Sequence, residues 1–212
     1  LDVNDKGYGT GKGPGGVGAY GGGAYGDGAS HGGEGGDYGY GTTTPLPYGN
    51  LLMPETLGSG GYWHSGGGAV HLTVNGTVKL AEGTAIQANA SGTGAGGSVF
   101  LTASGLTGGG TISAHNTGTS YGPGSGGRIA VILTNGDFSG FEGAITAHGG
   151  SSAGGAGGSA GTIYLKTSSI GDAGTLILDN NGALGEKNVV HTPLPDDMDV
   201  HDFSEIIVRN GG

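Results

Sequence analysis

Acidic and histidine side chains are the residues of this chain that could do acid–base chemistry. His31, Glu34 and Asp37 lie close together in a glycine-rich segment, and His64 follows later in the same segment. A glycosidase needs two carboxylates about 5 to 10 Å apart, and these residues are the candidates for such a site. Most other acids fall at turns, where carboxylates are usually just solvated. The sequence therefore favours a non-catalytic protein and predicts no catalytic residues, with a polysaccharide lyase or glycoside hydrolase as an open alternative.

A second group of acids offers the hard oxygen ligands that Ca²⁺ prefers. They stand near the two ends of the chain, and neither run has the spacing of an EF-hand. The sequence predicts no required cofactor and, at most, a structural calcium ion. Its candidate ligands are Asp2, Asp5, Asp196, Asp197 and Asp199.

Aromatic side chains suggest a binding or interface surface. Seven of the nine Tyr and the only Trp fall within residues 5–67, in a Gly-X alternation. The alternation of the predicted strands also places an aromatic stripe on their outer face. Such a stripe could stack on sugar rings or on another subunit, or it could pack beneath the long N-terminal loop. The candidate ligand-binding or interface residues are Tyr62, Trp63, His71, Phe100 and Tyr164.

A repeat positions these side chains. A short apolar strand follows a glycine-rich run four times, beginning at residues 69, 98, 128 and 162, with intervals of 29, 30 and 34 residues. A period in this range indicates stacked supersecondary units that bury their apolar faces against one another. Alternation along the strands predicts inward columns formed by Val70, Val99, Ile129 and Ile163, and by Leu72, Leu101, Val131 and Leu165.

Each repeat is predicted to contain three short strands, as in residues 69–74, 77–80 and 84–88, separated by Asn-Gly and Glu-Gly turns. Three strands per coil are typical of a parallel β-helix. The third strand is expected to recur at 86–89, 112–115, 145–148 and 177–180, and both chain ends fit the same phase at 1–4 and 207–210. This pattern predicts about five or six turns, and it predicts that subunits could stack end to end in register.

The predicted fold is all-β: a right-handed parallel β-helix (β-solenoid) with stacked glycine-rich loops at one corner and a long Gly/Tyr-rich N-terminal loop. Glycine makes up 56 of the 212 residues, and the absence of Cβ lets neighbouring backbones approach closely. We expect a single domain over residues 1–212. Within it, 5–67 form the long loop insertion, 68–190 the regular coils, and 191–212 an irregular excursion and the last strand.

Composition excludes several partners. A net charge of −10 with only seven Lys and Arg disfavours nucleic acid and anionic membrane surfaces, because both need clustered positive charge. No apolar run approaches the roughly 18 to 20 residues that span a bilayer, so membrane insertion is not expected. The lack of Cys, with abundant Gly, Ser, Thr and Asn, favours an extracellular or cell-surface location.

The glycine-rich strings resemble a known class of repeat. They include Gly7-Tyr8-Gly9, Gly66-Gly67-Gly68-Ala69-Val70, Gly126-Gly127-Arg128-Ile129-Ala130 and Ala160-Gly161-Thr162-Ile163-Tyr164-Leu165-Lys166. These strings resemble the glycine-rich β-helical repeat modules of large secreted bacterial surface proteins, which have a pectin-lyase-like architecture. The resemblance covers nearly all of the chain. The resemblance implies an architecture and not a chemistry. We therefore expect an extracellular structural or adhesive β-solenoid that associates with itself, end to end or laterally, or with extracellular polysaccharide; a carbohydrate-binding module is the alternative.

Overall fold

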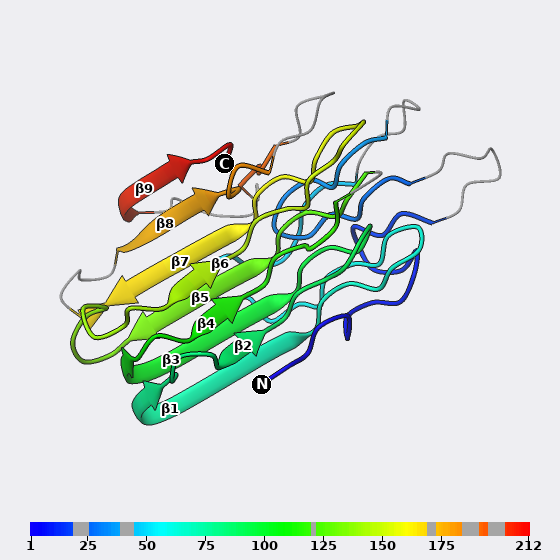
Figure 1. The fold of residues 1–212 in the computed structure, drawn as a ribbon. Coiled ribbons are helices and arrows are strands. Elements are labelled where there is room, and N and C mark those ends of the chain that lie inside the picture. Colours follow the sequence, from blue (N-terminus) through cyan, green and yellow to red (C-terminus); the bar gives the residue numbers. More distant parts are fainter. Residues whose placement is uncertain (19–25, 39–44, 120–121, 169–172, 184–190, 195–201) are drawn as a thin grey trace.

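The computed structural model describes residues 1–18, 26–38, 45–119, 122–168, 173–183, 191–194 and 202–212. Nearly all of its regular structure is β-strand, and the strands stack as a β-solenoid of about four turns (Figure 1). The predicted all-β solenoid is confirmed, while five or six turns was too many. Among the described residues, no helix has the length and apolar character needed to cross a bilayer.

The larger of two sheets carries the repeat. It has six strands in the order β1-β3-β5-β7-β8-β9, and the first four are parallel. Their register pairs Val70 with Val99, Val99 with Ile129, and Ile129 with Ile163, as the alignment of the apolar strands predicts. The strands are β1 (Ala69–Lys79), β3 (Ser98–Thr107), β5 (Arg128–Leu133), β7 (Thr162–Thr167), β8 (Gly174–Asp179) and β9 (Phe203–Arg209).

The smaller sheet is parallel and consists of β2 (Ala85–Gln87), β4 (Thr111–Ser113) and β6 (Ala144–Thr146). It pairs Ile86 with Ile112 and Ile112 with Ile145, again in the predicted register. The chain start extends this sheet, because Asp2 bridges to Gln87 in parallel. The predicted third-strand alignment is therefore confirmed from residues 1–4 to residues 145–148.

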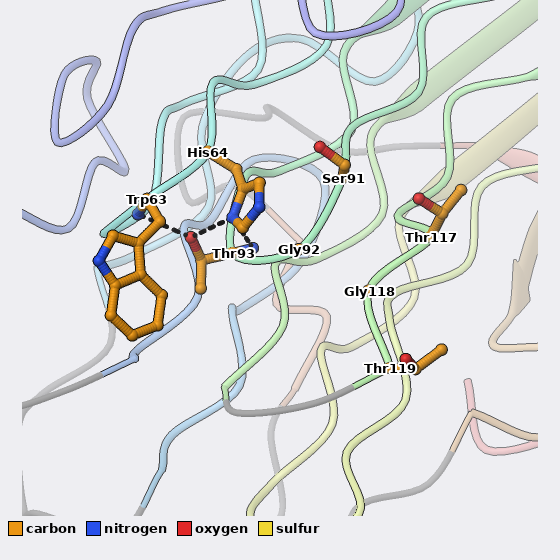
Figure 2. Close-up of a pocket in the computed structure, with 8 residues that line it drawn as sticks. All are labelled: Trp63, His64, Ser91, Gly92, Thr93, Thr117, Gly118 and Thr119. Carbon is orange, nitrogen blue, oxygen red and sulfur yellow. Dashed lines mark hydrogen bonds between the residues drawn. The ribbon is translucent and has the colours of Figure 1, made fainter.

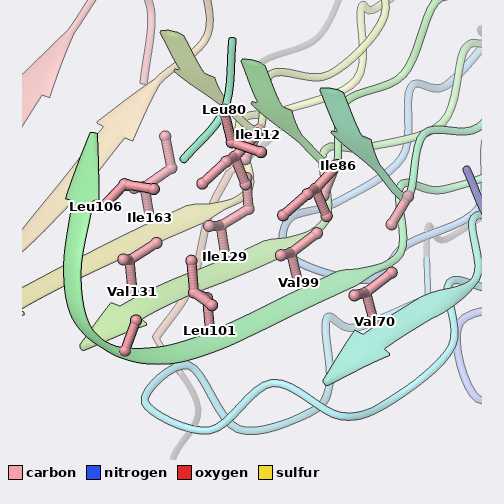
Figure 3. Close-up of a cluster of buried hydrophobic side chains, with 14 of the residues drawn as sticks. Val70, Leu80, Ile86, Val99, Leu101, Leu106, Ile112, Ile129, Val131 and Ile163 are labelled. Atoms are coloured by element: carbon pink, nitrogen blue, oxygen red, sulfur yellow. The ribbon is translucent and has the colours of Figure 1, made fainter. Parts of the chain in front are cut away.

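The core lies between the two sheets (Figure 3). Alternate residues of the large sheet point inward as predicted, and Val99, Leu101, Ile129 and Val131 are fully buried. The small sheet contributes Ile112, which is also fully buried. Stacking of coils thus removes these aliphatic side chains from water, which no single repeat could do alone.

Two of the three predicted strands per coil merge into one. β1 continues through the predicted Asn75-Gly76 turn to Lys79, and the pairing register with β3 shifts between Val74 and Thr77. A β-bulge explains this difference, since an extra residue can bend a strand without ending it. The coils therefore have two sheets, and the glycine-rich corner closes the third side.

The last two strands do not follow the predicted parallel phase. β8 pairs antiparallel with β7, with Ile163 opposite Ile177, and β9 pairs parallel with β8 in the large sheet. Only residues 168–173 connect β7 to β8, and a parallel crossover needs a dozen or more residues. The first and last strands consequently belong to different sheets, and the prediction of in-register stacking between subunits was wrong in its premise.

Glycine pairs form the junction between the corner and the large sheet. The first glycine of three successive Gly-Gly pairs faces the carbonyl oxygen of the alanine that directly follows a small-sheet strand, and a Cβ there would lie well inside 3.0 Å of that oxygen. The same oxygens accept backbone N–H groups of the next coil at 2.7–2.8 Å. Only glycine fits such an approach. These close contacts join Gly67 to Ala88, Gly96 to Ala114 and Gly126 to Ala147.

The fourth coil departs from this pattern where the stacking ends. Ala160 occupies the position that Gly126 holds one coil earlier. In the described part of the chain, the small sheet has no fourth strand beyond β6. The requirement for glycine at the first position of the pair thus ends with the partner strand that imposes it.

Candidate functional site

A cleft of about 290 Å³ opens beside the glycine-rich corner (Figure 2). One wall comes from the long N-terminal loop and the other from two successive coils, and the volume lies at the small end of the range for ligand sites. The lining residues are Trp63, His64, Ser91, Gly92, Thr93, Thr117, Gly118 and Thr119.

Coil stacking brings the hydroxyl groups of the cleft together. Ser91 and Thr117 follow β2 and β4 at equivalent positions, because the preceding residues Ala90 and Asn116 form a parallel bridge. The Thr117 N–H also donates to the Ala90 carbonyl at 2.9 Å. Neighbouring coils are separated by about 4.8 Å, so the two hydroxyls form a short ladder along one wall.

Trp63 presents an aromatic face at this cleft. Its side chain is 50% exposed, and the Tyr62 ring packs edge-on against it with 4.7 Å between ring centroids. The Trp63 backbone N–H donates to Thr93 Oγ1 at 3.1 Å. These contacts hold an exposed indole in a defined orientation, which suits stacking against a ligand ring.

His64 lies between Trp63 and the hydroxyl ladder. The Thr93 N–H donates to His64 Nδ1 at 3.3 Å, which assigns the lone pair to Nδ1 and the proton to Nε2 in the neutral ring. Nε2 is on the Ser91 side of the ring (Figure 2). The imidazole packs against Gly92, where φ is +50° and a Cβ would overlap the ring. Glycine at position 92 therefore makes room for a hydrogen-bond donor in the cleft.

Most of the outer aromatic stripe is buried. Phe100 is 7% and Tyr164 4% exposed, and both pack in a second apolar cluster with Leu51 of the long loop. His71 stacks on Phe100 at 4.7 Å and stays half exposed, with Nδ1 2.9 Å from a Glu55 carboxylate oxygen. Packing beneath the loop thus accounts for Phe100 and Tyr164, whereas Trp63 remains accessible.

The described candidate calcium ligands are engaged in local hydrogen bonds. Asp2 Oδ1 accepts the Asn4 N–H at 2.9 Å, and Asp5 Oδ1 accepts the N–H and Oγ–H of Ser91 at 2.9 and 3.0 Å. In the described part of the chain, no three His, Cys, Asp or Glu side chains are grouped to hold a metal ion. Asp196, Asp197 and Asp199 lie outside the described residues.

The candidates for acid–base chemistry do not form a shared site. His31 is fully buried; its Nδ1 donates to the Gly96 carbonyl at 2.6 Å, and its Nε2 accepts the Thr56 hydroxyl at 2.8 Å. Burial, reinforced by the charge of Arg128, lowers the His31 pKa to about 3. Arg128 is also fully buried and donates from Nε to the Tyr48 carbonyl at 2.8 Å. Both side chains tie the N-terminal loop to the solenoid.

The acids of the same loop have other partners. Glu34 Oε2 accepts the His191 N–H at 2.8 Å. Asp37 is buried beside Asp27, whose carboxylate accepts the Tyr38 N–H at 3.1 Å. Burial and, less strongly, the neighbouring Asp37 raise the Asp27 pKa, while the Tyr38 hydrogen bond opposes that shift. The contacts of Glu34 and Asp37 are thus those of groups that hold the loop in shape.

Sequence reasoning identified Trp63 and Tyr62 but missed Ser91, Thr93 and Thr117. These hydroxyls lie in glycine-rich runs, where Ser and Thr are common as loop residues. Their equivalent positions after aligned third strands were the available signal.

Comparisons of this chain with protein-family models, with curated proteins and with solved structures give no match.

Proposed function

We propose that this protein is an extracellular, non-catalytic β-solenoid with an adhesive role, and that it binds carbohydrate in the cleft beside Trp63. The observation that carries the proposal is a half-exposed indole, braced by Tyr62, facing hydroxyl groups from two successive coils. Aromatic faces stack on the apolar faces of sugar rings. Hydroxyls and the imidazole supply the hydrogen bonds that fix orientation in such sites.

The composition of the cleft supports binding without cleavage. Of the described residues that line it, none is Asp, Glu, Lys or Arg. Glycoside hydrolysis by the usual route needs two carboxyl groups across the scissile bond. A lining of indole, imidazole and hydroxyl groups can hold a sugar but lacks that pair.

Retention on insoluble polysaccharides tests this proposal. A panel of cellulose, chitin, starch, xylan and mannan should include at least one polymer that retains the wild-type protein, and Trp63→Ala should abolish that retention. Leu46→Ala is the matched control, because Leu46 is an exposed apolar side chain (74% exposed) of the same long loop outside the cleft lining. Retention of Trp63→Ala equal to wild type, or no retention by any polymer, would contradict the proposal.

Self-association through one end of the solenoid is a second candidate function, supported by β9. This strand lies at the end of the large sheet, where Ile206 and Val208 are 53% and 58% exposed, and in the described residues it pairs only with β8. Exposed edge strands readily pair with another chain. Sedimentation velocity should then show association that Val208→Lys abolishes; a monomer at all concentrations would refute it.

A further inference from the structure

We infer that the cleft selects neutral, hydroxyl-bearing glycans and discriminates against acidic ones such as uronates and sulfated sugars. This inference rests on the proposed carbohydrate function and names the class of sugar that the same site would take. It follows from where the hydroxyl protons of the cleft already point.

The Ser91 hydroxyl donates its proton to the Asp5 carboxylate. Ser91 Oγ lies 3.0 Å from Asp5 Oδ1, and an ionised carboxylate can only accept. The same oxygen also accepts the Ser91 N–H at 2.9 Å, so the arrangement is fixed twice. Toward the cleft, Ser91 can therefore offer only the lone pairs of its oxygen.

Thr117 lies at the equivalent position one coil further on. Its Oγ1 is 3.4 Å from the Ala90 carbonyl oxygen, a contact too long to fix the hydroxyl proton, so this hydroxyl can accept or donate. Ser91 alone thus presents only acceptor lone pairs to a ligand. A ligand group that meets Ser91 must donate a hydrogen bond, which sugar hydroxyls do and carboxylate or sulfate groups do not.

The negative charge of the protein also disfavours acidic ligands in the cleft. Asp5 is hydrogen-bonded directly to a lining residue, and the whole chain carries a net charge of −10. The described lining includes no Lys or Arg to offset an anionic ligand. At a partly desolvated site, repulsion between the Asp5 carboxylate and one anionic group of the ligand corresponds to roughly a tenfold or greater loss of affinity.

A neutral sugar can complement Ser91, Thr117, His64 and Trp63. Its hydroxyls can donate to Ser91 Oγ and Thr117 Oγ1, and one of its oxygens can accept the Nε2 proton of His64. The ring face remains available for Trp63. The selectivity for neutral sugars thus needs no side-chain rearrangement.

A glycan array with paired probes tests the inference. Each neutral gluco-, galacto- and manno-oligosaccharide is printed beside the uronate and sulfated forms of the same backbone, and wild-type protein is compared with Trp63→Ala. We expect Trp63-dependent binding to neutral probes at least tenfold tighter than to their acidic partners. Acidic probes that bind as tightly as neutral ones, in a Trp63-dependent manner, would overturn the selectivity but leave the carbohydrate function standing. No Trp63-dependent binding to any probe would refute both.

Asp5→Asn separates charge from geometry. Asn Oδ1 can still accept both Ser91 bonds, while the negative charge is gone. We expect this variant to bind acidic probes several-fold more tightly than wild type does, and to bind neutral probes as wild type does. Asp137→Asn makes the same charge change at an exposed turn and should leave the ratio unaltered. An unchanged ratio in Asp5→Asn would contradict the electrostatic part of the argument.

Discussion

Replacing Gly161 by alanine should disrupt the junction between the glycine-rich corner and the large sheet. A Cβ on Gly161 would lie far inside 3.0 Å of the Gly127 carbonyl oxygen. That oxygen accepts the Thr162 N–H at 3.0 Å at the start of β7, and the Gly161 N–H donates to the Ala147 carbonyl at 2.7 Å. The alanine can be accommodated only if the Gly127 carbonyl retreats by more than 1 Å, which would break the first of these bonds and strain the second.

The expected loss in the free energy of unfolding follows from these contacts. Losing a buried backbone hydrogen bond costs about 1–3 kcal/mol, and overpacking a rigid site costs about 1–3 kcal/mol more. With two bonds affected, the free energy of unfolding should fall by roughly 3–6 kcal/mol, a large fraction of a domain's usual stability. In a chain of this length, the thermal midpoint should drop on the order of 10 °C.

Thermal and urea unfolding, followed by circular dichroism, measure this effect. Gly154→Ala is the matched control, because a Cβ there meets nothing within 4 Å. It should leave the midpoint unchanged or raise it slightly through reduced entropy of the unfolded chain. Equal losses in the two variants, or no loss in Gly161→Ala, would refute the steric explanation of glycine at this junction.

Three further predictions concern buried polar groups. Arg128→Met should lower the free energy of unfolding by about 3 kcal/mol, because the Tyr48 carbonyl that accepts from Nε is left without a donor, and Arg128→Lys should restore little of it; urea unfolding that matches wild type would contradict this. The folded protein holds the His31 pKa at about 3, so the unfolded chain binds more protons between about pH 6.5 and pH 3. The free energy of unfolding should therefore fall by about 1.4 kcal/mol for each unit by which the pH is lowered in this range. His31→Gln should flatten that slope in urea titrations, and an unchanged slope would disprove it. The raised Asp27 pKa has the opposite sign, so its contribution is lost as pH rises; Asp27→Asn should raise the thermal midpoint at pH 8 more than at pH 4, and an equal shift at both would exclude the charge argument.

Much of the repeat could be predicted because its physical signals are local. Alternation along residues 98–101 and 128–131 assigned inward and outward faces correctly, since the side-chain period of a strand is two. The predicted third-strand alignment places Asn89 and His115 at equivalent positions, and there the His115 N–H donates to Asn89 Oδ1 at 3.0 Å. These features depend only on residues that recur at fixed intervals.

The reversal of β8 could not be predicted from alternation. Residues 177–180 match the third-strand pattern, but a pattern of period two does not define strand direction. The short connection over residues 168–173 was the decisive constraint, because chain length and not side-chain chemistry limits a crossover. Likewise, hydroxyls such as Ser91 became site candidates only when coil stacking placed them opposite a loop from residues 62–64.

Tryptophan fluorescence tests the central claim most directly, because Trp63 is the only Trp in the chain and lies in the cleft. Titration with a neutral oligosaccharide that the protein retains should change the emission saturably and shield the indole from acrylamide quenching. Binding of that oligosaccharide, confirmed by calorimetry, with no change in emission or quenching would place the sugar elsewhere and contradict the account.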